Sequence, residues 1–236
     1  MKRDRFFYTG CGAIFLVLTL IGFRNYIFGG RLFNGAPINP AMLAAIVAHS
    51  SAVFAWFVLF FVQSVLIATQ NRRLHMKLGW SVLVIASTIA VTGPFVAIRS
   101  TSLENITVFD WPARPFLLVM LTEIALYVIF VAIGVLNRKR PRIHRPMMLL
   151  ASLSLISGAT ARIPLVNSIF GFHLWMALFA PVVALGGICL LVRWAMTRTL
   201  EREFVVGYAT LVAVSLVVSR LAMTNVWVNL AGILVQ

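Results

Sequence analysis

Five ionisable side chains fall inside long apolar runs of the sequence, where charged groups are rare. They are two histidines, a glutamate and two arginines: His49, Glu123, Arg162, His173 and Arg220. Neutral imidazoles are the usual axial ligands of b-type haem in membranes, and arginine pairs well with the carboxylates of its propionates. Imidazoles such as those of His49 and His173 could also ligate a transition metal such as copper or zinc. These residue types therefore predict a site for b-type haem or a metal.

A structural role is the alternative for the same residues. His49 and His173 could be buried imidazoles that bond to a neighbouring carbonyl or serine, and Glu123 could form an internal ion pair with Arg162 or Arg220. At about 1.5 Å of rise per residue, all five fall in one half of the predicted membrane thickness. Because a polar group facing lipid costs several kcal/mol, we expect one polar cluster inside a helical bundle.

The elements that must position this cluster are membrane-spanning helices. Hydrophobic residues make up 61% of the 236 positions and charged residues 11%, whereas soluble domains average about 45–50% and about 25%. Apolar runs of roughly 18–25 residues recur along the chain, which is the length that crosses about 30 Å of hydrocarbon. Residues 1–236 are therefore predicted to form a single integral membrane domain, an all-α polytopic bundle.

Seven transmembrane helices are predicted, followed by an apolar tail to residue 236. Their ranges are 6–23, 41–69, 78–98, 115–136, 146–167, 170–193 and 204–223. Of the 20 Lys and Arg residues, 14 fall at the N-terminus and around the connections after the second, fourth and sixth helices. Because basic loops stay in the cytoplasm, this predicts a bacterial inner-membrane protein with a cytoplasmic N-terminus and a periplasmic C-terminus.

The formal charge of +14 follows from the same basic loops. We interpret it as attraction to the anionic headgroups of the lipid bilayer and not as nucleic-acid binding. Membrane protein partners are compatible with the sequence. It contains no phosphate-binding glycine loop, Gly-x-Ser-x-Gly, His-Glu-x-x-His or Cys-x-x-Cys motif, so it indicates no particular enzyme class. Cys11 and Cys189 fall toward cytoplasmic helix ends, where a disulfide is not expected.

Two of the basic connections carry a histidine in a similar setting. The segments NRRLHMKLGW (71–80) and RPRIHRPMML (140–149) align His75 with His144, and an apolar helix follows each. A third copy, MTRTLEREFV (196–205), has Glu201 at the histidine position. This pattern predicts three repeated helical hairpins, formed by helices 2–3, 4–5 and 6–7, with the first helix as an extra element.

His75 and His144 could set a turn, cap a helix or bind a lipid phosphate, or they could ligate a metal or haem on the cytoplasmic side. On the second helix, His49, Trp56 and Gln63 are spaced by seven residues and share a stripe within about 40°. We expect this stripe to face the bundle interior. Trp56 could wall a porphyrin slot or belong to ordinary packing.

Two long segments, AHSSAVFAWFVLFFVQSVLIATQNRRLHMKLGW and RPRIHRPMMLLASLSLISGATAR, resemble an uncharacterised family of bacterial multi-pass membrane proteins. In that family a His-bearing helix leads to an Arg-x-Leu-His-x-x-Leu-Gly turn, and a later His-Arg-x-Met-Met-like turn opens a helix that ends in Arg. The matching positions are His49, Gln63, His75, Gly79, His144, Met147 and Arg162. The resemblance spans residues 40–170 and implies no particular activity.

A second likeness is to the two-haem transmembrane b-type cytochromes, in which four histidines of a helical bundle hold one haem near each face. His49 and His173 correspond to an outer pair and His75 and His144 to an inner pair, although the inner pair lies in turns. This likeness implies b-type haem in the outer half, used in membrane electron transfer or oxidase assembly. The alternative function is a non-redox membrane protein with structural histidines, either a small transporter or a subunit or partner of a larger membrane complex.

Overall fold

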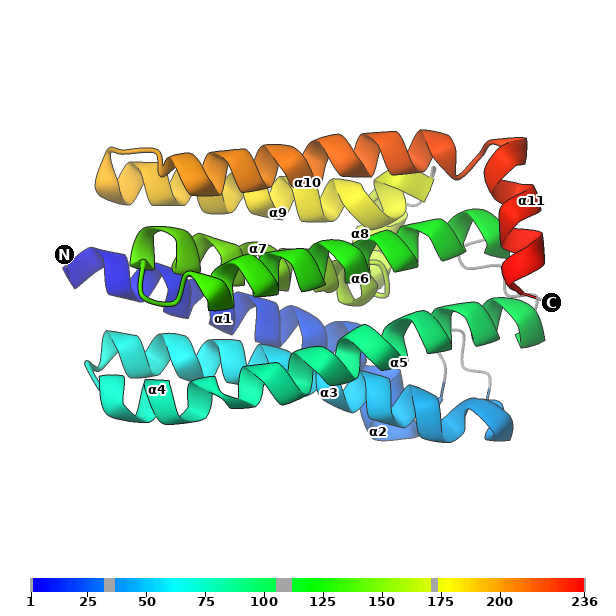
Figure 1. Cartoon of the computed structure of the whole chain (residues 1–236), viewed down its shortest axis with the longest axis horizontal. Coiled ribbons are helices and arrows are strands. Elements are labelled where there is room, and N and C mark those ends of the chain that lie inside the picture. The colour runs from blue at the N-terminus through cyan, green and yellow to red at the C-terminus, as the bar shows by residue number, and fades with distance from the viewer. Residues whose placement is uncertain (1, 32–36, 105–111, 171–173, 236) are drawn as a thin grey trace.

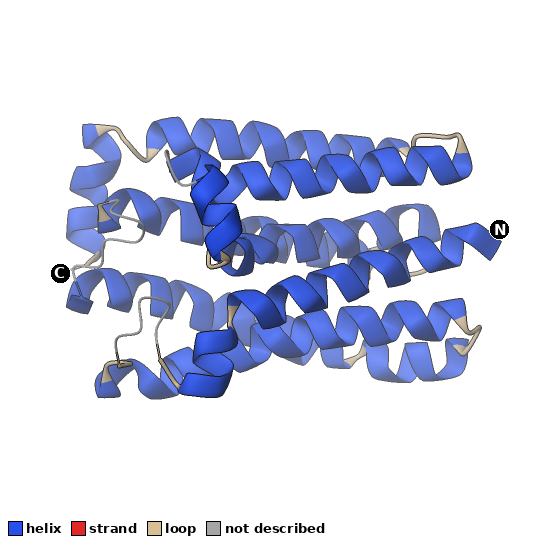
Figure 2. Ribbon diagram, turned by 180° about the vertical axis from the view of Figure 1, so that it is seen from behind, coloured by secondary structure: helices blue, strands red, loops and turns tan. Residues whose placement is uncertain are grey.

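The long helices run side by side along one axis, and a short helix lies across one end (Figure 1). This computed structural model describes residues 2–31, 37–104, 112–170 and 174–235, and every regular element in these ranges is an α-helix (Figure 2). In chain order the helices are α1 (Lys2–Gly22), α2 (Arg24–Gly29), α3 (Pro40–Ala68), α4 (Arg72–Gly79), α5 (Ser81–Glu104), α6 (Ala113–Leu136), α7 (Pro141–Thr160), α8 (Pro164–Phe170), α9 (Leu174–Thr197), α10 (Arg202–Leu221) and α11 (Asn225–Leu234). The all-α prediction is therefore confirmed.

The two ends of the bundle differ in charge. The start of α1 and the connections α3–α4, α6–α7 and α9–α10 lie together at one end (Figure 1). This end, called the basic end below, holds the segments that carry 14 of the 20 Lys and Arg residues. The opposite end, crossed by α11, is called the far end. The chain thus reverses direction where the pattern of basic loops predicts.

Five helices are long and apolar enough to cross a membrane: Pro40–Ala68, Arg72–Ser102, Ala113–Leu136, Leu178–Thr197 and Arg202–Leu221. The pair α7 and α8 qualifies as a sixth when taken together, but it is bent by 93° at its break. The predicted first span corresponds to a shorter apolar helix, Phe6–Gly22, and the predicted tail contains the short helix α11. In the described residues the chain is a helical bundle with five or six helices able to span a membrane, against seven predicted.

Local sequence explains where several helices begin and break. The side chains of Asn39 and Asn71 accept hydrogen bonds from the first-turn amides of α3 and α4, and Thr224 does the same for α11. Such caps satisfy amides that have no partner within the helix. Pro164 begins α8, and because proline has no amide hydrogen and crowds the preceding turn, it favours a break after α7. Pro94 and Pro181, by contrast, lie inside α5 and α9. The sequence therefore marks a position where a break can form.

Helix α7 is the central element, in contact with α1, α3, α6, α9 and α10. Its small residues allow this, because α1 approaches so closely that a Cβ on Gly22 would lie 2.2 Å from the carbonyl oxygen of Ala159. The helices of each predicted hairpin pack against each other, α3 on α5, α6 on α7 and α9 on α10. Their origin as three copies of one unit stays a prediction.

A packed contact joins α3, α6 and α7 near the middle of the bundle. Trp56 on α3 is 1% exposed, donates its Nε1–H to the Ser152 hydroxyl on α7 at 3.1 Å, and meets the Tyr127 ring of α6 edge-on with centroids 4.8 Å apart. These three residues, called the central core below, lie near the middles of their helices. They join α3, α6 and α7 between the two ends of the bundle.

Candidate functional site

A cavity of about 650 Å³ lies in the half of the bundle remote from the basic end. It is called the far cavity. Its walls come from the end of α1, from α2, from the first halves of α3 and α6 and from the second halves of α5 and α7. Three of the five residues predicted from the sequence line it, namely His49, Glu123 and Arg162. The structure thus brings together an imidazole, a carboxylate and a guanidinium that are far apart in sequence.

The orientation of His49 is set by α5. Its Nδ1 lies 3.1 Å from the Thr92 hydroxyl oxygen, and that hydroxyl donates its own hydrogen to the Thr88 carbonyl at 2.6 Å. Because the Thr92 hydrogen is already used, Nδ1 must be the donor of the His49–Thr92 bond, which leaves the lone pair on Nε2. In the part of the chain that the structure describes, Nε2 has no hydrogen-bond partner. This nitrogen is available to a ligand.

Arg162 and Glu123 face the same cavity without neutralising each other directly. Arg162 follows the end of α7, donates to the Gly158 carbonyl and stacks its guanidinium 5.0 Å from the Phe23 ring centroid. Glu123 lies close enough to interact with it electrostatically, but the described residues show no salt bridge between the two. Glu123 Oε1 is buried and has no well-aligned hydrogen bond among those residues, and the Ser157 hydroxyl lies beside this carboxylate. Glu123 and Arg162 therefore interact electrostatically but do not form the predicted ion pair in the described residues. Polar atoms of both side chains remain available to a ligand.

Arg220 is not among the residues that line this cavity in the described part of the chain. Its side chain is exposed in the last turn of α10, whose buried face carries Ser215 and Val218. Two residues beyond Val218 the helix has rotated by about 200°, so Arg220 points away from the interior. Counting residues along the run predicts depth but not the face of the helix. His173, the fifth predicted residue, lies outside the described residues.

The other candidates are distributed along the bundle. The stripe of His49, Trp56 and Gln63 does face the interior, but its members serve three regions. His49 lines the far cavity, Trp56 belongs to the central core and Gln63 lies toward the basic end. His75 and His144 also meet at the basic end, with ring centroids 6.5 Å apart. They contribute nothing to the far cavity.

A further group of polar residues, which the sequence does not predict, joins α1 to α9 and α10 near the basic end. Arg193 forms a salt bridge with Glu201 at 2.5 Å, and the Tyr8 hydroxyl donates to the other carboxylate oxygen of Glu201 at 3.5 Å. Beside it, Cys11 Sγ and Cys189 Sγ are 3.7 Å apart, both buried and both free thiols. From the sequence, Cys11 and Cys189 are expected at the same end of the bundle, but nothing in it predicts that they meet.

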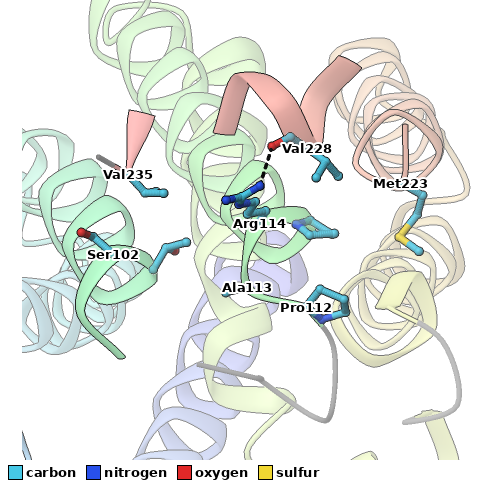
Figure 3. A pocket seen from close by; sticks show the side chains of 9 residues that line it. Ser102, Pro112, Ala113, Arg114, Met223, Val228 and Val235 are labelled. Atoms are coloured by element: carbon cyan, nitrogen blue, oxygen red, sulfur yellow. Dashed lines mark hydrogen bonds between the residues drawn. The ribbon is translucent and has the colours of Figure 1, made fainter. Parts of the chain in front are cut away.

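A second cavity, of about 660 Å³, lies beneath α11 at the far end (Figure 3). Arg114 is its charged residue, and α11 already holds it: Nη1 donates to the Val228 carbonyl at 3.4 Å, and Trp227 Nε1 donates to the Arg114 carbonyl at 2.7 Å. The residues that line it include no histidine, cysteine or carboxylate in the described ranges. The far cavity is therefore the better candidate site.

Comparisons with protein-family models, with curated proteins and with solved structures found no match. Within residues 2–31, 37–104, 112–170 and 174–235, no three His, Cys, Asp or Glu side chains gather as a metal-binding group. The far cavity must therefore be interpreted from its own chemistry. It offers one free imidazole nitrogen, one cation and one carboxylate at the edge of an apolar space.

Proposed function

We propose that this protein binds an amphipathic cofactor in the far cavity, and that the cofactor is b-type haem serving membrane electron transfer or oxidase assembly. The proposal depends on one observation: His49, Glu123 and Arg162 converge on a single, otherwise mainly apolar cavity of about 650 Å³. Pockets for small molecules and cofactors span about 300–1,000 Å³ and combine apolar walls with a few polar groups. The far cavity has this composition.

The residues present fit haem in three respects. His49 Nε2 would be the axial ligand, held in place by Thr92 as ligand histidines usually are by a second partner. Arg162 would pair with a propionate, and aromatic residues such as Phe54 and Phe116 would face the porphyrin. Haem would supply one-electron transfer. We propose His173 as the second axial ligand, because it lies five residues before Leu178, which lines the cavity.

The basic end is proposed to face the bacterial cytoplasm, which places the far cavity in the periplasmic half of the inner membrane. The asymmetry of 14 basic residues at this end supports the orientation. Cations near the headgroups would bind anionic lipids there. Contacts with membrane protein partners are part of the same proposal, since oxidase assembly requires them.

A small transporter is the second candidate function. The observation that favours it is the 93° break between α7 and α8, which lies beside Arg162 at the far cavity. In many transporters, broken helices form the substrate site near such a break. An amphipathic anion that pairs with Arg162 would be the substrate class.

The absorption spectrum of the detergent-purified chain tests the proposed function. Wild-type protein is expected to show a reduced-minus-oxidised band of b-type haem. His49→Ala is expected to lose most of the haem because it removes the axial ligand, whereas His75→Ala, the matched control at the other end, is expected to keep it. Colourless wild-type protein, or equal loss from both variants, would contradict haem in the far cavity; colourless protein that transports an amphipathic anion would favour the second candidate.

A further inference from the structure

The two histidines of the basic connections meet in space with a gap between their rings. His75 on α4 and His144 near the start of α7 have ring centroids 6.5 Å apart and ring planes inclined at 82°. Two imidazoles joined directly by an N–H···N bond would have centroids about 5 Å apart. Two imidazoles opposed on one metal ion, with metal–nitrogen bonds of about 2.0 Å, would have centroids roughly 6.3 Å apart. The observed separation is too long for a direct bond, lies within the range of about 4.5–7 Å for packed ring pairs and is close to that of the second arrangement.

Buried polar atoms without a well-aligned hydrogen bond lie on His75 and close to α4. The Gln63 side-chain atoms Oε1 and Nε2 are buried without a hydrogen-bond partner among the described residues, and His75 Nδ1 has no well-aligned bond there. The His75 ring lies close to the Gln63 backbone. Gln63 lies beside α4, since its Nε2 would be 3.9 Å from a Cβ on Gly79, one turn after His75. Buried polar atoms are almost always hydrogen-bonded, so these atoms are available as donors to a bound ion.

His144 is already oriented as a metal ligand. Its Nδ1 lies 2.9 Å from the Gly134 carbonyl oxygen, and because a carbonyl can only accept, Nδ1 carries the hydrogen. The lone pair is then on Nε2, and the backbone bond fixes the ring, as it does for most histidines that ligate metals. A thioether lies nearby, since Met148 Sδ is 2.9 Å from the position of a Cβ on Gly134.

We infer that His75 and His144 bind one Cu(I) ion, with Gln63 and Met148 as the adjoining weaker donors. Two nitrogen ligands are enough for a d¹⁰ ion in linear coordination, and thioethers favour Cu(I) over harder ions. Arg145 interacts electrostatically with both imidazoles, so a monovalent ion suffers half the repulsion of a divalent one. This site shares no residue with the far cavity and does not depend on haem binding there.

Competition for Cu(I) between the purified full-length protein and a chromogenic Cu(I) chelator, under reducing conditions, tests the inference. We expect one Cu(I) per wild-type chain and at least about 100-fold weaker binding in His75→Ala and in His144→Ala, because each removes a ligand. His49→Ala is the matched control and is expected to bind Cu(I) like the wild type. X-ray absorption at the copper edge should show two nitrogen neighbours.

The buried thiols provide the decisive control. If Cu(I) binding disappears in Cys11→Ser and persists in His75→Ala, the ion belongs to the thiol pair and the inference is wrong. Equal affinity in the wild type and in a His75→Ala/His144→Ala double variant would also overturn it, because the gap would then hold only water. A haem band lost in both single variants would assign the pair to haem instead. Should His144→Ala fail to fold, His75→Ala and the wild-type absorption data still decide.

Discussion

The far cavity and the gap between His75 and His144 both contain histidine, but the free space beside the imidazole differs between them. In both places a histidine has its Nδ1 held by an oxygen, that of Thr92 for His49 and that of Gly134 for His144. The first histidine opens on about 650 Å³, and the second faces another imidazole 6.5 Å away. The space beside each imidazole, more than the imidazole itself, decides whether a cofactor or a single ion fits.

Charge is also distributed differently at the two ends. Near the basic end, Arg193 is 4% exposed and paired with Glu201, which also accepts from Tyr8. In the far cavity, Glu123 and Arg162 share a space without a salt bridge in the described residues. We infer that the first pair holds helices together, whereas the second pair is left open for a ligand.

The largest effect on stability is expected from Glu201→Gln. This change leaves the buried Arg193 guanidinium without its carboxylate, and breaking a buried pair costs about 3 kcal/mol. For a chain of this size the melting temperature in detergent should fall by roughly 6–12 °C. Thermal unfolding followed by circular dichroism measures it.

Glu123→Gln is the matched control for that comparison, because it makes the same chemical change in the far cavity. No salt bridge is lost there in the described part of the chain, so the stability change should stay within about 1 kcal/mol. Equal destabilisation by the two variants would show that Glu123 also has a structural role. The proposed difference between a structural ion pair near the basic end and an open pair of charges in the far cavity would then be wrong.

A smaller effect, on binding and not on stability, is expected from filling the far cavity. Gly93 lines it, and a Cβ there would lie 3.1 Å from His49 Cε1 and 2.6 Å from the movable end of Ile124. Gly93→Leu should therefore occupy the space beside the imidazole and reduce the haem content of the purified protein at least about tenfold, a change of about 1.4 kcal/mol.

Gly93→Ala serves as its control: Ile124 has to shift, His49 has to give by only a few tenths of an ångström, and most of the space remains. Haem content per chain, from the absorbance of pyridine extracts, separates the two variants. Cu(I) affinity at the basic end should be unchanged in both. A Gly93→Leu protein that keeps its haem would place the cofactor elsewhere.

The sequence predicts the long helices and their direction well because both depend on local quantities. Apolar length decides where a helix can span, and basic residues mark the ends at which the chain reverses. It predicts the break after Arg162 less well: the expected span 146–167 runs through Pro164, where the structure bends by 93°. The sequence shows the proline, but it does not show the packing of the neighbouring helices that leaves space for the bend.

The site is predicted only in part, for a geometrical reason. Residue spacing fixes the depth of His49, Glu123 and Arg162, and the structure brings these three together. The same spacing places Arg220 at a suitable depth, but the rotation of α10 turns it outward. The contact between Cys11 and Cys189 depends on α1 and α9 being neighbours in the bundle. No pattern in the sequence indicates that these two helices pack together.

The smallest effect is expected in the central core. Trp56→Phe removes the bond to the Ser152 hydroxyl, and Ser152→Ala removes it from the other side. Hydrogen bonds between membrane helices contribute about 0.6 kcal/mol on average, so the coupling energy from the double-mutant cycle should be of that size. The same variants test whether the two sites are independent. If the central core has only a structural role, the melting temperature of each variant should fall while its haem content and Cu(I) affinity stay constant. Loss of either ligand in Trp56→Phe would show that the central core transmits structural change between the ends, and the two sites would have to be treated as one coupled system.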